Sequence, residues 1–221
     1  MRATTLVMLI FMSAVVTAHT AYASPLYVGT ELDYAALKFT PHYSYILTGD
    51  PDKGYTDRAE GIEFRMLAGY GVQLNKTFSL DFQTHFGLNS AVWDLDTTEP
   101  AHLEYKIPYT YGISLLPSAR ITDKASLLAE IGLEQGYIQE KKDSSDSSIS
   151  SYSFSKWVGG YSVGGGASYD LSRHFKVSLF YRYREYNHIS YDTHLPDGTL
   201  AERVKDRPSI WSINIGMSYS F

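Results

Sequence analysis

The sequence contains no cysteine, so disulfide bonds, thiol catalysis and cysteine-ligated metals are excluded. It has no apolar run of the ~20 residues that a membrane-spanning helix needs, and its most apolar stretch covers only residues 6–16. It also has no excess of positive charge, because 19 Lys and Arg residues stand against 24 Asp and Glu residues. A mildly acidic chain without a basic block is not typical of a nucleic-acid-binding protein.

The first residues have the pattern of a secretory signal peptide. Arg2 supplies a positive charge, residues 6–16 form a short apolar segment, and Ala21-Tyr22-Ala23 fits a small-residue cleavage site. We therefore expect residues 1–23 to be removed after Ala23. The remaining residues 24–221 are enough for one exported domain with a full core.

Hydrophobicity alternates with a period of two along most of the chain. Between positions 61 and 74, for example, Ile62, Phe64 and Met66 fall on one face, whereas Glu63 and Arg65 fall on the other. This is the period of a strand and not of a helix. The same pattern predicts eight strands, at about residues 27–36, 61–74, 78–88, 105–115, 126–134, 157–170, 176–184 and 211–221.

The connections between these strands alternate between short and long. Short turns are expected at residues 75–76, 122–124 and 172–174. Long polar loops are expected at residues 40–59, 89–103, 135–156 and 186–207. Such an alternation is the layout of an up-and-down membrane barrel, and an even number of strands places both termini on the side of the short turns.

The residue types on the two faces indicate which one points inward. A soluble lipocalin-type barrel also has eight strands, with its apolar face inside. Here the polar face is rich in glycine, which weakens a strand but suits the narrow interior of an eight-stranded barrel. Its charges include both signs, so we expect them to pair and close the lumen. The predicted luminal charges are Glu31, Asp33, Glu63, Arg65, Asp81, Arg120, Glu130, Arg182 and Arg184.

The apolar face carries aromatic residues near the expected strand ends. Amphipathic rings prefer the level of lipid headgroups, so Trp157, Trp211, Tyr105 and Tyr183 are candidate interfacial anchors. The sequence therefore predicts an all-β, eight-stranded antiparallel up-and-down transmembrane β-barrel.

The chain ends on Gly216-Met217-Ser218-Tyr219-Ser220-Phe221. Gly216, Tyr219 and Phe221 resemble the C-terminal assembly signal of Gram-negative outer-membrane proteins, a glycine followed by two aromatic residues. Together with the Leu26-Tyr27-Val28-Gly29 start and the strand pattern, this ending makes the chain similar to the small eight-stranded outer-membrane barrels, the opacity-protein-like, OmpX-like and OmpA transmembrane-domain-like group. The resemblance implies a monomer in the cell outer membrane, with short periplasmic turns and four long extracellular loops. It also implies recognition by the β-barrel assembly machinery and contact with outer-membrane lipids and lipopolysaccharide.

Three functions remain open at this point. The resemblance favours a surface protein of the adhesin or serum-resistance type, whose loops bind host or environmental ligands; loop aromatics such as Tyr137 and Phe154 are candidate contacts. The alternatives are a small outer-membrane channel and a lipid A-modifying enzyme. We expect no enzyme, because His85 is the one mature histidine within a strand interior and no serine-hydrolase arrangement is evident. No cofactor or metal is expected either.

The terminal motif generates a first prediction. Deleting Phe221 or replacing it with serine should impair membrane insertion in cells far more than refolding in detergent, because the resemblance implies a recognition role for this residue. The two measurements are the amount of folded barrel in isolated outer membranes and the refolded yield in detergent. Small and equal effects in both would leave Phe221 as an ordinary lipid-facing residue.

Overall fold

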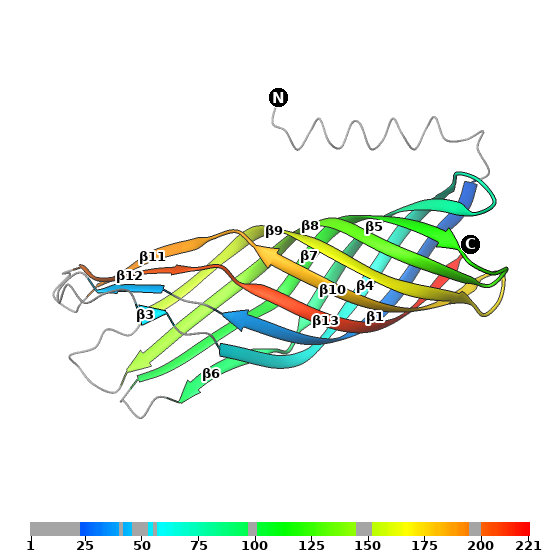
Figure 1. Cartoon of the computed structure of the whole chain (residues 1–221). Helices are drawn as coiled ribbons and strands as arrows, with labels where there is room; N and C mark the ends of the chain where they lie inside the picture. The colour runs from blue at the N-terminus through cyan, green and yellow to red at the C-terminus, as the bar shows by residue number, and fades with distance from the viewer. Residues whose placement is uncertain are drawn as a thin grey trace.

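Eight long strands form a closed antiparallel barrel in the computed structural model of the chain (Figure 1). The structure describes residues 23–39, 42–45, 53–54, 57–96, 101–144, 152–194 and 200–221. The barrel strands are β1 (Ala23–Phe39), β4 (Asp57–Gln73), β5 (Phe78–Asn89), β7 (Ala101–Arg120), β8 (Ala125–Ser144), β9 (Tyr152–Asp170), β10 (Phe175–Tyr186) and β13 (Ser209–Ser220). The shorter strands are β2 (His42–Tyr45), β3 (Lys53–Gly54), β6 (Val92–Asp96), β11 (Ile189–His194) and β12 (Leu200–Asp206). The described residues include no helix with the length and apolar character needed to cross a membrane.

The ring closes because every barrel strand has two neighbours. The order is β5-β4-β1-β13-β10-β9-β8-β7, and an additional pairing joins β5 to β7. Following paired residues once round the ring leads from Arg58 to Ala68, ten residues further along β4 (68 − 58). A stagger of this size over eight strands corresponds to a strand tilt of about 40°. The predicted eight-stranded antiparallel barrel is confirmed.

Three tight turns join strands at one end of the barrel, which we call the turn end (residues 74–77, 121–124 and 171–174). Each turn is held by a short polar side chain that accepts two backbone hydrogen bonds. Asn75 Oδ1 accepts from the amides of Thr77 (2.8 Å) and Phe78 (2.9 Å). Thr122 Oγ1 and Ser172 Oγ each accept in the same way from the second and third residues after them. The short turns predicted from the sequence therefore follow from local Asx and Ser/Thr chemistry.

The two faces of the wall differ as the period of two predicts. Outward residues such as Ile213, Ile215 and Leu179 are 54–68% exposed, whereas the inward Arg65 and Arg182 are 0–1% exposed. An exposed apolar wall around a buried polar interior is the reverse of a soluble domain. It is the arrangement of a barrel surrounded by lipid.

The strands continue far beyond the predicted strand ends. Of the expected loop at residues 135–156, β8 occupies the part to Ser144 and β9 the part from Tyr152. The segment at residues 186–207 contains β11 and β12, and the other two contain β2, β3 and β6. The sequence predicts loops here because the outer face has no apolar alternation where it leaves the lipid. Backbone pairing nevertheless continues in these segments, so the prediction is wrong. The rest of these segments, such as residues 145–151, lies outside the described residues.

A second sheet stands beyond the barrel at the end opposite the turns, which we call the sheet end. Its four strands follow the order β11-β12-β2-β3, and Figure 1 shows them projecting past the barrel strands. Beneath this sheet the barrel interior is apolar. The side chains of this apolar core are Ala35, Leu37, Ala59, Ala91, Tyr105, Ile107, Ile138, Val158, Tyr186, Ile189 and Ile210.

Tyr105 belongs to this core and not to the lipid-facing wall. It is 3% exposed, and Ile107 is fully buried, whereas Tyr109 is 43% exposed. The pairing of β7 with β8 shifts by one residue between Lys106 and Tyr109, which is a β-bulge at Pro108. Proline cannot donate to the ladder and favours such bulges. Because an extra residue inverts the side-chain alternation, the prediction of Tyr105 as a lipid anchor is wrong.

The boundary between β5 and β6 depends on Gly61 of β4. Ser90 Oγ accepts a hydrogen bond from the Ile62 amide (3.0 Å), and the Ser90 amide donates to the Ile62 carbonyl (2.8 Å). These bonds bring the chain so close that a Cβ at position 61 would lie 2.5 Å from both the amide nitrogen and the Cα of Ala91. Only glycine fits here without moving the backbone.

Replacing Gly61 with alanine should therefore destabilise the barrel by about 1–3 kcal/mol, the usual cost of overpacking. Gly165→Ala is the matched control, because its Cβ would meet only the Leu128 carbonyl oxygen at 3.7 Å. Urea unfolding of both variants in lipid vesicles provides the comparison. Equal stabilities would show that the approach of Ala91 to Gly61 is relaxed at no cost.

Candidate functional site

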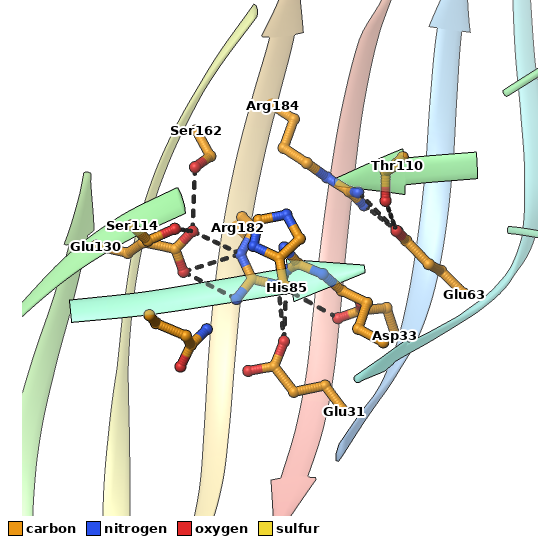
Figure 2. Close-up of polar contacts among 12 residues, drawn as sticks. Glu31, Asp33, Glu63, His85, Thr110, Ser114, Glu130, Ser162, Arg182 and Arg184 are labelled. Carbon is orange, nitrogen blue, oxygen red and sulfur yellow. Dashed lines mark hydrogen bonds and ion pairs between the residues drawn. The ribbon is translucent and has the colours of Figure 1, made fainter. Parts of the chain in front are cut away.

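Arg182 lies at the centre of an ion-pair network that fills the middle of the lumen (Figure 2). Its guanidinium donates to Glu130 through Nε (2.9 and 3.0 Å) and Nη2 (2.8 Å). Nη1 donates to Glu31 at 3.1 Å and lies 3.7 Å from Asp33. Ser114 and Ser162 add hydrogen bonds to the same oxygen of Glu130. One arginine thus joins β10 to β8 and to β1, each of which lies two strands away round the ring.

A second pair lies nearer the sheet end. Arg184 donates to both carboxylate oxygens of Glu63 (2.9 and 2.5 Å), and Thr110 donates to Glu63 as well (2.7 Å). Figure 2 shows Arg184 and Thr110 converging on the Glu63 carboxylate. This bidentate geometry is the strongest form of the Arg–carboxylate interaction.

Arg65 and His85 extend the network. Arg65 Nη1 donates to Glu31 (3.4 Å), and its Nη2 lies 3.5 Å from Glu134. His85 Nε2 lies 3.0 Å from the other oxygen of Glu134. All these side chains are at most 6% exposed. Removing a charge from water costs several kcal/mol per ion. The hydrogen bonds that these side chains share offset this cost and so stabilise the interior.

Seven of the nine predicted luminal charges meet in this network. They are Glu31, Asp33, Glu63, Arg65, Glu130, Arg182 and Arg184. Asp81 and Arg120 do not join it, because they lie at the turn end, where Arg120 is exposed. Glu134 was missed, although the alternation of Glu130, Gly132 and Glu134 on one face could have revealed it.

Phe180 separates the network from the turn end. Its ring is 3% exposed inside the lumen, with the Arg182 guanidinium 5.3 Å from the ring centroid. A Cβ at Gly164 or Gly166 would collide with this ring, whereas Gly165 faces outward. Gly164 and Gly166 therefore make room for one aromatic ring.

Below this ring the lumen contains a polar cavity. A cavity of about 80 Å³ at the turn end is lined by residues that include Tyr27, Asp81, Arg120, Asp170 and Lys176. Above the network, the apolar core occupies the other end of the lumen. Among the described side chains, the interior is thus layered from a polar cavity through ion pairs to an apolar core.

The outer wall carries two aromatic belts. Toward the sheet end, Trp211 contacts Tyr183 (ring centroids 4.3 Å apart) and Trp157 contacts Tyr137 (5.1 Å). At the turn end, Tyr219 contacts Phe221 (5.3 Å), which is 67% exposed. The ten residue steps from Trp211 to Phe221 span about 25 Å along the barrel axis at ~40° tilt, the height of a typical lipid-facing band. Tyr137 and Phe154 are not free loop contacts, because Tyr137 joins this belt and Phe154 packs against the apolar core.

The sheet end presents charged residues on an exposed face. Arg203 of β12 makes two hydrogen bonds with Asp192 of β11 (2.8 and 3.0 Å), and these residues are register partners. The hydrogen bonds and charge of Asp192 raise the pKa of Arg203. Ser190 and Lys205 lie beside this pair and line the same shallow surface groove.

The arrangement brings one histidine next to a carboxylate inside the lumen. His85 and Glu134 form a histidine–carboxylate pair, but both side chains are fully buried in the lumen. The described residues also include no group of three or more His, Cys, Asp or Glu that could hold a metal ion.

Comparisons with known proteins agree with this architecture. A family model described as outer membrane protein beta-barrel domain matches residues 4–221. No curated protein matches the sequence. Similar solved structures include Neisserial surface protein A, with 17% identity over 90% of this chain and 99% of that chain, at a TM-score of 0.45. Ail, the attachment invasion locus protein of Yersinia pestis, has 14% identity over 85% and 97%, at 0.40. The outer membrane protease OmpT from Escherichia coli has 11% identity over 92% and 100%, at 0.54. At these identities the likeness extends to the fold alone.

Replacing Arg182 with methionine should destabilise the barrel by about 3–5 kcal/mol, because Glu130 and Glu31 would lose their buried partner. The matched control is Arg120→Met at the turn end, which should change stability by no more than about 0.5 kcal/mol. Urea unfolding of both proteins in lipid vesicles gives the comparison. Similar losses for the two variants would contradict a central role for Arg182.

Proposed function

The chain belongs to the outer membrane protein β-barrel family, and from this we propose a non-enzymatic surface-binding protein whose lumen is closed to solutes. In outer-membrane barrels the short turns face the periplasm and the longer segments face the exterior. The sheet end is then the part that projects from the cell. Its ligand is a host or environmental molecule, which fits an adhesin or serum-resistance protein.

The observation that carries this proposal is the second sheet. Mobile loops must be ordered when they bind, and this ordering lowers affinity. Here β11, β12, β2 and β3 are paired with one another and stand over the apolar core. Ile189 and Asp206, the register partners at the base of the β11–β12 hairpin, are 4% and 5% exposed. Because the hairpin is anchored in this way, the Asp192–Arg203 face is already ordered and can bind a ligand without the ordering cost.

The layered interior supports a closed lumen. The bonds of Arg182 to β1 and β8 cross the narrow part of the barrel, and the apolar core lies between them and the sheet end. An ion crossing the barrel would have to break buried ion pairs and then enter an apolar layer, and both steps are unfavourable. A small channel remains the second candidate, favoured only by the polar cavity at the periplasmic end.

Removing the hairpin tests the proposal. Residues 190–205 would be replaced by Asn-Gly, a two-residue turn that can join the paired Ile189 and Asp206. Wild-type and shortened proteins would be refolded and tested for binding to immobilised fibronectin, laminin and serum proteins. We expect the shortened barrel to keep its heat-resistant electrophoretic mobility and to lose at least tenfold in binding, in line with roughly 1.4 kcal/mol of lost contacts.

Arg120→Met is the control, because it changes a charge at the opposite end and should bind like the wild type. Planar-bilayer recordings on the same preparations should show no steady conductance. Undiminished binding by the shortened barrel would contradict the surface-binding role. Steady conductance of the wild type would support a channel instead.

A further inference from the structure

The ion-pair network in the lumen contains more acids than bases. Its carboxylates are Glu31, Asp33, Glu63, Glu130 and Glu134, and its guanidinium groups are those of Arg65, Arg182 and Arg184. Among the described residues, the network therefore carries two more negative than positive charges when His85 is neutral, and one more when His85 is protonated. A surplus charge is costly in a buried, water-poor interior, where an acid commonly takes up a proton instead.

Asp33 is the acid of this network that the arginines leave unsatisfied. Both of its carboxylate oxygens are buried and have no hydrogen-bond partner among the described residues. The Arg182 Nη1 atom lies 3.7 Å from Asp33 Oδ1, which is too long for a hydrogen bond, and it donates to Glu31 at 3.1 Å instead. Glu63 and Glu130, by contrast, each accept at least two hydrogen bonds from an arginine. An ionised Asp33 would have one distant arginine contact and no hydrogen bond.

The charges that face Asp33 are of both signs. Arg182 and Arg184 lie on β10, Glu63 and Arg65 on β4, and Glu31 on its own strand β1, whereas β13 contributes the neutral Asn214 and Ser212. Glu63 is the direct register partner of Asp33. Like charges directly opposite each other on a sheet are destabilising. Because the three arginines donate to other acids of the network, Asp33 lies opposite a carboxylate without a donor of its own.

Asn214 is the other register partner of Asp33, across the β1–β13 ladder. It is 1% exposed, and neither its amide oxygen nor its amide nitrogen has a hydrogen-bond partner among the described residues. A neutral carboxylic acid offers one O–H donor and one carbonyl acceptor, and a primary amide offers the complementary pair. Protonated Asp33 and Asn214 can thus satisfy all four polar atoms with two hydrogen bonds. Ionised Asp33 has no donor for the Asn214 oxygen.

Water or a metal ion accounts for this site less well than a proton does. A buried water can hydrogen-bond to both side chains, but it leaves the surplus negative charge unchanged. The described part of the chain has no group of three or more His, Cys, Asp or Glu that could hold a metal ion. One carboxylate with neutral oxygens is also a poor set of ligands for a divalent cation. A proton satisfies the hydrogen bonds and removes the charge at the same time.

We propose that Asp33 is a proton-binding site inside the barrel, occupied in mildly acidic medium and emptied as the medium becomes basic. In the protonated state, the Asp33 O–H donates to the Asn214 oxygen, and the Asn214 amide donates to the Asp33 carbonyl oxygen. The proton comes from the medium and returns to it. The site is separate from the sheet-end surface that carries the proposed ligand-binding function.

Proton binding links the stability of the barrel to pH. In an unfolded chain an aspartate releases its proton at about pH 4. Above that pH, the folded barrel with a proton on Asp33 binds more protons than the unfolded chain does. Folding stability therefore falls as the pH rises through the range in which folded Asp33 ionises.

The test compares wild-type protein with Asp33→Asn, which keeps the shape of the side chain and removes its charge. Urea unfolding in lipid vesicles would be followed at about pH 5 and about pH 8. Between these pH values, the unfolding constant of the wild type should rise about tenfold more than that of Asp33→Asn, because the variant has no proton to lose at this site. Infrared spectra at the lower pH should show a protonated carboxyl band in the wild type that Asp33→Asn lacks.

Glu130→Gln is the matched control, because it also neutralises a buried acid, but one that accepts hydrogen bonds from Arg182. This variant should be less stable than the wild type at both pH values. Asp33→Asn should be as stable as the wild type at the lower pH and more stable at the higher.

The proposal is overturned if Asp33→Asn loses as much stability as Glu130→Gln, because Asp33 would then be an ionised partner of Arg182. Equal pH dependence of the wild type and Asp33→Asn would overturn it as well. Failure of Asp33→Asn to refold would also contradict it, since the site should accept a neutral side chain of the same shape.

Discussion

The structure depends on one electrostatic constraint, which is that every charge on the inner face must find a partner inside a narrow, water-poor lumen. Arg182 meets this constraint by bonding to Glu130 and Glu31, residues 52 and 151 positions away in the chain. Because breaking such a pair leaves an isolated buried charge, the network resists any shift of one strand against another. Removing Glu31 or Glu130 would deprive Arg182 of a buried partner, which links the register of β1 and β8 to that of β10.

A single bulge changes the character of the interior along the axis. On the turn-end side of Pro108 the inward residues of β7 include the polar Thr110 and Ser114, whereas beyond it they are the buried Tyr105 and Ile107. Because of the extra residue, Tyr105 and Ile107 point inward, although an unbroken alternation would place them on the lipid-facing side. The same chain thus has a polar interior where lipid surrounds it and an apolar core where water does. This apolar core supports the separate sheet that stands above the barrel.

The two ends of the barrel consequently differ in what they can offer a partner. The turn end has tight turns and a small polar cavity, with little surface of its own. The sheet end carries paired strands and an exposed ion pair between Asp192 and Arg203.

The sequence by itself determined the strand number, the faces of the strands, the turns and the polar, charge-lined interior. These features are local, because a period of two and residues such as Asn75 and Ser172 act within a few positions. Only the tertiary structure decided that Tyr105 points inward, that Arg120 stays outside the network, and that the polar segments continue as strands. These outcomes depend on register, bulges and stagger, which are fixed by pairing between residues far apart in the chain and leave no periodic signal in the sequence.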